Sequence, residues 1–191
     1  MNMLAAVFRR SSFFRWCAGF LLLAFFSTAF ANTIPCRNAE LRIDGSTAVF
    51  SADYDLAFSS GQVDALMRGI PLYFVLEWKV TQPRWYWFDK TRVNDQTTFR
   101  ISYQPLTEKY RLSSGLLVID VMTLEEAEKV IGRISSRPLF SIDDLDLGTR
   151  YLFEIRLRFD HERLPSPFRL NTFGSQEWRT ASDWLSLEFV P

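Results

Sequence analysis

The sequence predicts a mainly β protein: an antiparallel β-sandwich, immunoglobulin-like in general architecture, with two short helices. Apolar residues recur at every second position in several segments, which is the spacing of one strand face. Aromatic residues make up 16% of the chain, with 18 Phe among them, and such residues favour strands. Two short helices cannot cover every apolar strand face, so two packed sheets are favoured over the alternative, a helix-covered α+β sheet.

The strand candidates begin after a predicted turn at Asp44-Gly45. In most of them charged or polar residues alternate with the apolar ones, which predicts one buried face and one solvated face. Residues 116–122 differ, because they are almost continuously apolar and therefore predict a strand buried on both faces. The candidates are residues 50–58, 72–80, 99–103, 116–122, 151–159 and 184–190.

Two segments carry helix signals. Ser60 is expected to cap a helix that runs through Arg68 and ends at Gly69-Ile70-Pro71. Thr123, with Glu126 three residues later, has the pattern of a capping box at the start of a helix running to about Ser135. The apolar stripes expected to be buried are Val63, Leu66 and Met67 in the first helix, and Leu124, Ala127, Val130, Ile131 and Ile134 in the second.

Residues 1–31 have the pattern of an export signal. Three arginines precede an apolar run over 16–26, and Ala29 and Ala31 supply the small-x-small pattern of a cleavage site. The run is shorter than the roughly 20 residues that a membrane-spanning helix needs. We therefore expect cleavage near Ala31, a single β-rich domain over 32–191, and a periplasmic or secreted location. The alternative is an inner-membrane protein anchored by residues 16–30.

The charge and the cysteine content of the chain limit the classes of function that are open to it. The predicted leader holds three arginines and no acidic residue, so the mature chain has 19 basic and 22 acidic residues and a formal charge of −3. An acidic exported protein is not expected to bind nucleic acid. The mature chain keeps one cysteine, Cys36, close to its expected mobile N-terminus. Cys36 is expected to be incidental, with a free or intermolecularly paired thiol as the alternative.

Residues that could carry catalysis or bind a metal are few. His161 stands between Asp160 and Glu162 at a strand end, where adjacent side chains point to opposite faces and do not converge. The chain has one histidine and two cysteines, too few for the usual transition-metal site. The acidic segment 143–146 is expected to be a polar turn. The sequence therefore predicts no catalytic residue, no metal and no cofactor.

The aromatic segment Arg84-Trp85-Tyr86-Trp87-Phe88 is the strongest candidate for a binding site. On a strand, Trp85 and Trp87 would share one face, and Tyr86 and Phe88 would share the other. Only one face of a sandwich strand is core, so the second would form an aromatic platform, with Arg84 and Arg92 beside it to hold a carboxylate or phosphate. The alternative is that loops or the first helix cover the segment as core.

Several uncommon motifs follow one another along the chain. They are Gly69-Ile70-Pro71-Leu72 with the strand to Lys79, the aromatic segment through Asp89, Tyr103, Tyr110-Arg111-Leu112, Leu164-Pro165 with Phe168, and Ser182-Asp183-Trp184. In this order they resemble the bacterial domain-of-unknown-function family 4390. The resemblance implies an exported single-domain protein with no assigned reaction. It also implies a link to signalling, because genes of this family often stand beside those of a nitrogen-regulation-type two-component sensor kinase.

Together these observations predict a non-catalytic interaction or accessory protein of the bacterial cell envelope, linked to a two-component sensor. Its expected partner is an envelope protein or peptide, and it is expected to meet the membrane only through an uncleaved signal segment. Two alternatives stay open. One is a carrier of a small apolar ligand or glycan, and the other is a hydrolase whose catalytic residues are dispersed along the sequence.

Overall fold

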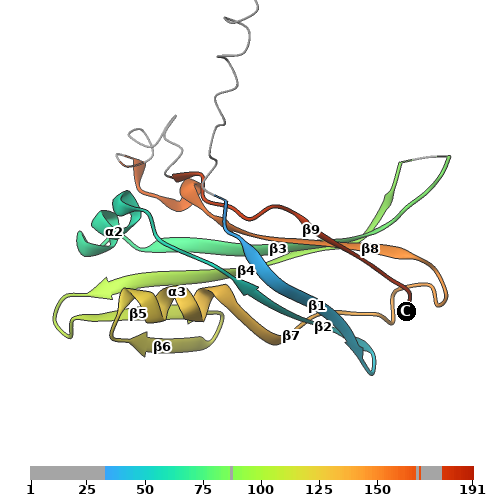
Figure 1. The fold of residues 1–191 in the computed structure, drawn as a ribbon, viewed down its shortest axis with the longest axis horizontal. Coiled ribbons are helices and arrows are strands. Elements are labelled where there is room, and N and C mark those ends of the chain that lie inside the picture. Colours follow the sequence, from blue (N-terminus) through green and yellow to red (C-terminus); the bar gives the residue numbers. More distant parts are fainter. Residues whose placement is uncertain (1–32, 87, 167, 169–177) are drawn as a thin grey trace, which may run out of the picture. The chain divides into compact units, whose positions relative to one another are not determined.

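Two antiparallel sheets form the fold (Figure 1). The computed structural model describes residues 33–86, 88–166, 168 and 178–191. The smaller sheet has the order β1-β2-β7 and the larger has the order β6-β5-β4-β3-β8-β9. The strands are β1 (Cys36–Asp44), β2 (Thr47–Tyr54), β3 (Leu72–Gln82), β4 (Lys90–Gln104), β5 (Lys109–Ser114), β6 (Leu117–Val121), β7 (Arg133–Ser141), β8 (Tyr151–Phe159) and β9 (Leu185–Phe189). The mainly β, two-sheet prediction is confirmed.

The core lies where the inner faces of the two sheets meet. In β8 every second side chain from Tyr151 to Phe159 is buried, and the residues between them are only half-buried. The Phe153 ring on β8 lies 5.6 Å from the Phe50 ring on β2 and 5.9 Å from the Phe140 ring on β7, measured between centroids. Rings from both sheets thus interdigitate, which is how a sandwich buries its alternating rows.

Two helices cover the rest of the inner face of the larger sheet. These are α2 (Ser60–Met67) and α3 (Leu124–Gly132), and a single turn of 3-10 helix, η1 (His161–Arg163), follows β8. Leu66 and Ile131 place the two helices in the same buried cluster as the strands. Figure 1 shows α3 beside the smaller sheet, on the same side of β4 and β5. None of the described helices has the length and apolar character needed to cross a bilayer.

The helices agree with the sequence prediction except at four points. Val130 was expected in the buried stripe of the second helix but is 39% exposed, because it borders the open cavity beside β6. The capping box of α3 is formed by Thr123 and Glu126 as predicted, but the cap of α2 is Ser59 rather than Ser60. Met67 is exposed, because α2 turns Gln62, Ala65 and Leu66 inward instead. The second helix ends at Gly132, three residues earlier than expected, where the chain passes directly into β7.

Gly132 allows α3 to end against β2. A Cβ atom at this position would collide with the backbone carbonyl oxygen of Tyr54. A larger residue would therefore push the helix end away from the sheet. This close approach fixes where β7 begins and so fixes the position of everything that β7 carries.

The strands β5 and β7 were not predicted, and two further segments differ from the sequence prediction. The segment from Cys36 was expected to be a mobile terminus, but it forms β1, which pairs with β2 along its whole length. Residues 116–122 were expected to be buried, but β6 is the outer strand of its sheet, with Leu117 60% and Val118 57% exposed. That prediction is wrong because an apolar run reports composition, whereas burial depends on whether another layer covers the strand.

Candidate functional site

The hairpin formed by β3 and β4 extends beyond its neighbours. Pairing of β3 with β4 continues to Gln82 and Lys90, whereas pairing of β3 with β8 stops at Thr81. The loop of residues 83–89 therefore lies past the edge of the sheet, as Figure 1 shows. The backbone N–H of Arg84 donates to Oδ1 of Asp89 at 3.1 Å, which ties the two arms of the loop together.

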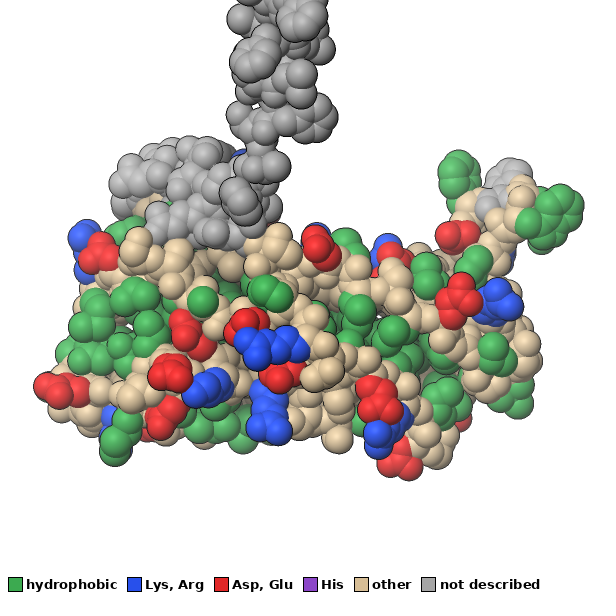
Figure 2. All heavy atoms as spheres, viewed as in Figure 1, with side chains coloured by type: hydrophobic (Ala, Val, Ile, Leu, Met, Phe, Trp, Pro, Cys, Tyr) green, Lys and Arg blue, Asp and Glu red, His purple; other side chains and the backbone are tan. Residues whose placement is uncertain are grey.

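The aromatic side chains of this loop face solvent. Trp85 is 94% exposed, Tyr86 66% and Phe88 87%. The Trp85 and Tyr86 rings meet edge to face with centroids 5.2 Å apart. Figure 2 shows hydrophobic side chains gathered at this protruding end of the molecule. We call Trp85, Tyr86 and Phe88 the aromatic tip.

The aromatic tip is not core, so the covered alternative does not hold for its three residues. The predicted division into two strand faces is also wrong, because residues 84–86 lie in an irregular loop. Pro83 at the loop entrance lacks the N–H that continued pairing would use. Trp87, the fourth predicted ring, lies outside the described residues.

The two predicted flanking arginines do not act as a pair. The Arg92 guanidinium forms an ion pair with Asp146 and donates a hydrogen bond to Oε1 of Gln82 at 3.1 Å. It is therefore already held between β3 and the segment that leads to β8. Arg84 is half-buried at the base of the aromatic tip. The geometry gives no two-arginine anion clamp, and what remains is a convex apolar tip.

The convex shape of the aromatic tip determines what kind of ligand it can bind. Its rings cannot enclose a small molecule, but they can enter a pocket on a larger surface, and buried Trp and Tyr carry much of the energy at protein interfaces. The hairpin holds the rings just beyond the last paired residues, Gln82 and Lys90. Residues 31–188 of the chain match the family described as a domain of unknown function, DUF4390.

The chain belongs to the DUF4390 family. No curated protein and no solved structure matches it. The family description names no reaction, so any function of this DUF4390 protein has to be argued from its own residues. Residues 1–31, where the export signal was predicted, lie outside the described residues.

The histidine of this DUF4390 protein stands apart from the acidic side chains beside it in sequence. His161 is exposed in η1, whereas the Asp160 carboxylate is buried and held by Arg163 at 3.1 Å and Arg158 at 3.5 Å. Within the part of the chain that the structure describes, no three His, Cys, Asp or Glu side chains lie close enough to share a metal ion.

On the outer face of the larger sheet, charged side chains form ion pairs with one another. Glu77 on β3 pairs with Arg156 and with Arg158 on β8, and Lys79 pairs with Glu154 at 2.8 Å. The Arg156 guanidinium also lies over the Trp184 ring, 4.4 Å from its centroid. Because these groups satisfy one another, this face of the DUF4390 fold is a weaker candidate for binding than the aromatic tip.

One candidate site was missed by the sequence analysis. A cavity between β4, β5, β6, α3 and β7 is lined by Ser114 and Arg137. These two residues are 23 positions apart and stand in no recognisable motif, so nothing local in the sequence indicates that they meet.

Proposed function

We propose that this protein is an exported, non-catalytic interaction protein of the bacterial cell envelope, and that it docks onto a partner protein through the aromatic tip. The single observation that carries the proposal is the exposure of Trp85, Tyr86 and Phe88 on a protruding hairpin. Large apolar side chains gathered at one exposed point mark interaction sites in soluble proteins.

A protein partner fits the tip better than a membrane surface. Asp89 follows Phe88 in the loop and its carboxylate accepts from the Arg84 N–H, so an anionic group would have to approach the headgroups of a bilayer together with the rings. The chain after residue 31 carries a formal charge of −3, which opposes binding to anionic lipid. A pocket in a protein, in contrast, can enclose Trp85 and Tyr86 while leaving Asp89 at the polar rim.

The exported location of the proposal is supported by the pattern of residues 1–31, with three arginines, an apolar run and the Ala29-x-Ala31 motif. The link between this family and two-component sensors supports one kind of partner, the outer segment of such a sensor. Both statements are parts of the proposal, and the experiment below tests them together with the docking site.

Site-specific photocrosslinking in the bacterium that makes the protein tests the proposal. A benzophenone amino acid replaces Trp85 in the full chain, and cells are irradiated before fractionation. The matched control carries the same amino acid at Leu106, which is fully exposed in the turn of the neighbouring β4–β5 hairpin. We expect one adduct of defined mass from position 85, absent from position 106 and lost when Tyr86→Ala and Phe88→Ala are added.

Three results would overturn the proposal. The first is equal crosslinking from both positions, which would show that exposure alone explains the adduct. The second is crosslinking to lipid together with sedimentation of the purified protein with phosphatidylglycerol vesicles, which would assign the tip to the membrane. The third is adduct formation only with cytoplasmic proteins, which would contradict the exported location.

A further inference from the structure

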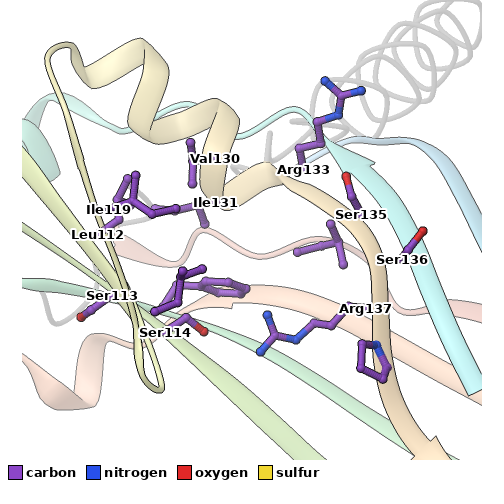
Figure 3. A pocket seen from close by; sticks show the side chains of 14 residues that line it. Leu112, Ser113, Ser114, Ile119, Val130, Ile131, Arg133, Ser135, Ser136 and Arg137 are labelled. Carbon is purple, nitrogen blue, oxygen red and sulfur yellow. The ribbon is translucent and has the colours of Figure 1, made fainter. Parts of the chain in front are cut away.

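A cavity of about 520 Å³ opens between the two sheets beside the second half of β4, where Phe99 lies (Figure 3). Its apolar wall includes Phe99, Leu112, Ile119 and Ile131, contributed by β4, β5, β6 and α3. The volume lies within the range of 300–1,000 Å³ typical of small-molecule sites. None of the described residues that line it is acidic.

Arg137 brings a positive charge to this apolar cavity. In the register it pairs with Phe50, whose side chain lies in the core, so Arg137 projects from the inner face of the smaller sheet. Its guanidinium lies 5.5 Å from the Phe99 ring centroid and donates to Oγ1 of Thr97 at 3.3 Å. Within the described part of the chain, no carboxylate lies within ion-pair distance of it. Burial lowers the pKa of Arg137, because the charged form loses solvation.

Ser114 brings a second polar group with no partner. Its Oγ atom is buried, and no described residue donates to it or accepts from it. Ser114 is two positions after the buried Leu112 on β5, which places both on the inner face. Figure 3 shows the Arg137 side chain extending from β7 toward Ser114. A cation and a hydroxyl thus face the same cavity.

A β-bulge sets the direction of Arg137. Two steps along β2, from Phe50 to Ala52, correspond to three along β7, from Arg137 to Ile134. Ser136 adopts φ 44°, in the left-handed region that residues other than glycine seldom occupy, and its N–H donates to Oγ of Ser51 at 3.0 Å. Without the extra residue, Ile134 and Arg137 would point to opposite faces of the sheet. The bulge lets Ile134 fill the core and Arg137 reach the cavity.

We propose that this cavity binds a single-chain fatty acid, with its carboxylate held by Arg137 and Ser114 and its hydrocarbon chain against Phe99, Leu112, Ile119 and Ile131. A planar guanidinium matches a carboxylate through two parallel hydrogen bonds, and the hydroxyl supplies one more donor. A phosphate monoester has more acceptor oxygens than these two groups can satisfy. Of the side chains along the tail, Ile119 is exposed and Phe99 is half-buried, whereas Leu112 and Ile131 are already buried and form the base of the cavity.

This inference is independent of the aromatic tip. The aromatic tip lies before the start of β4 and the cavity lies beside Phe99, and the nine residue steps from Lys90 to Phe99 span about 30 Å of extended strand. Failure of one proposal therefore leaves the other unaffected.

Isothermal titration calorimetry of the full chain tests the inference, with dodecanoate below the concentration at which it forms micelles. Dodecanol and dodecyl phosphate supply the same tail with a neutral head and a larger anionic head. We expect dodecanoate to bind with a stoichiometry of one, and to bind Arg137→Gln about tenfold more weakly or worse. Dodecanol should bind the parent protein and Arg137→Gln equally, which also shows that the variant keeps its fold and its cavity.

Three further variants distinguish Ser114, whose side chain lies on the inner face, from Ser113 and Arg133, which also border the cavity but whose side chains point away from it. Ser114→Ala should weaken dodecanoate binding, whereas Ser113→Ala should leave it unchanged, because alternation places Ser113 on the other face of β5. Arg133→Gln should also bind normally, since the exposed Arg133 side chain points away from Ser114 in Figure 3. Ser113→Ala makes the same substitution as Ser114→Ala, and Arg133→Gln removes the same charge as Arg137→Gln.

Four outcomes would overturn the inference. These are no binding of dodecanoate, equal binding of dodecanoate by Arg137→Gln and the parent protein, tighter binding of dodecyl phosphate than of dodecanoate, and non-saturating uptake that all variants share. A stable dimer that fails to bind dodecanoate would show that a second copy covers the cavity, and would overturn it as well.

Discussion

Two regions along β4 expose apolar surface in opposite forms. Before the start of the strand, Trp85, Tyr86 and Phe88 form a convex tip with no buried polar group among them. Beside Phe99, in the second half of the strand, apolar side chains form a concave wall around Ser114 and Arg137. The difference shows that shape and polar content, rather than exposed apolar area, distinguish a surface suited to a large partner from one suited to a small amphiphile.

The largest effect expected from this comparison is on stability. Ile131 is fully buried and forms both the floor of the cavity and part of the core, so Ile131→Ala should lower the free energy of unfolding by about 2–5 kcal/mol. Trp85→Ala removes a larger side chain from the tip but should change that free energy by less than about 0.5 kcal/mol. Urea denaturation measures both. A large loss for Trp85→Ala would return the tip to the core.

A smaller effect of opposite sign is expected at Ser114. Its hydroxyl is buried without a partner, so Ser114→Ala should raise the free energy of unfolding by about 1 kcal/mol while it weakens dodecanoate binding. Ser113→Ala is the matched control and should change neither quantity. Stabilisation with loss of binding is the result that separates a binding residue from a structural one. If Ser114→Ala destabilises the protein, the hydroxyl has a structural partner.

The smallest effect is confined to alkaline pH and concerns Tyr54, which is buried in the core. Burial raises the pKa of the Tyr54 phenol well above its usual value of about 10. Above about pH 10 the unfolded chain releases this proton while the folded protein keeps it, so the free energy of unfolding should fall as pH rises. Tyr54→Phe should make this fall shallower in urea denaturation, whereas Tyr86→Phe on the exposed tip should not. Equal slopes for both variants would contradict the assignment to Tyr54.

The sequence predicted best those strands that lie between two others. In β3 and β8 one face lies in the core along the whole strand, so its apolar row is continuous, and the other face carries the ion pairs of Glu77 and Arg156 over most of its length. β7 was missed because its bulge at Ser135-Ser136 and its proline at 138 interrupt the alternation. β1 was missed because, as an edge strand, it buries too few side chains to show a pattern.

The two candidate sites differed in how far they could be predicted. The aromatic tip was found from sequence because its residues are consecutive, although its loop conformation was not. Ser114 and Arg137 could not be found, because their meeting depends on the pairing of β5 with β4 and on the bulge that turns β7. A long-range contact of this kind leaves no periodic signal in either segment.

β6 also affects how the chain behaves before it reaches its native state. Its outer edge carries unpaired backbone groups beside exposed Leu117, Val118 and Ile119, with Asp120 as the strand's single charge. An unprotected apolar strand of this kind is a template on which a second unfolded chain can assemble as intermolecular cross-β structure. Refolding yield should therefore depend on protein concentration, and a lysine at position 118 should act as a gatekeeper against precipitation.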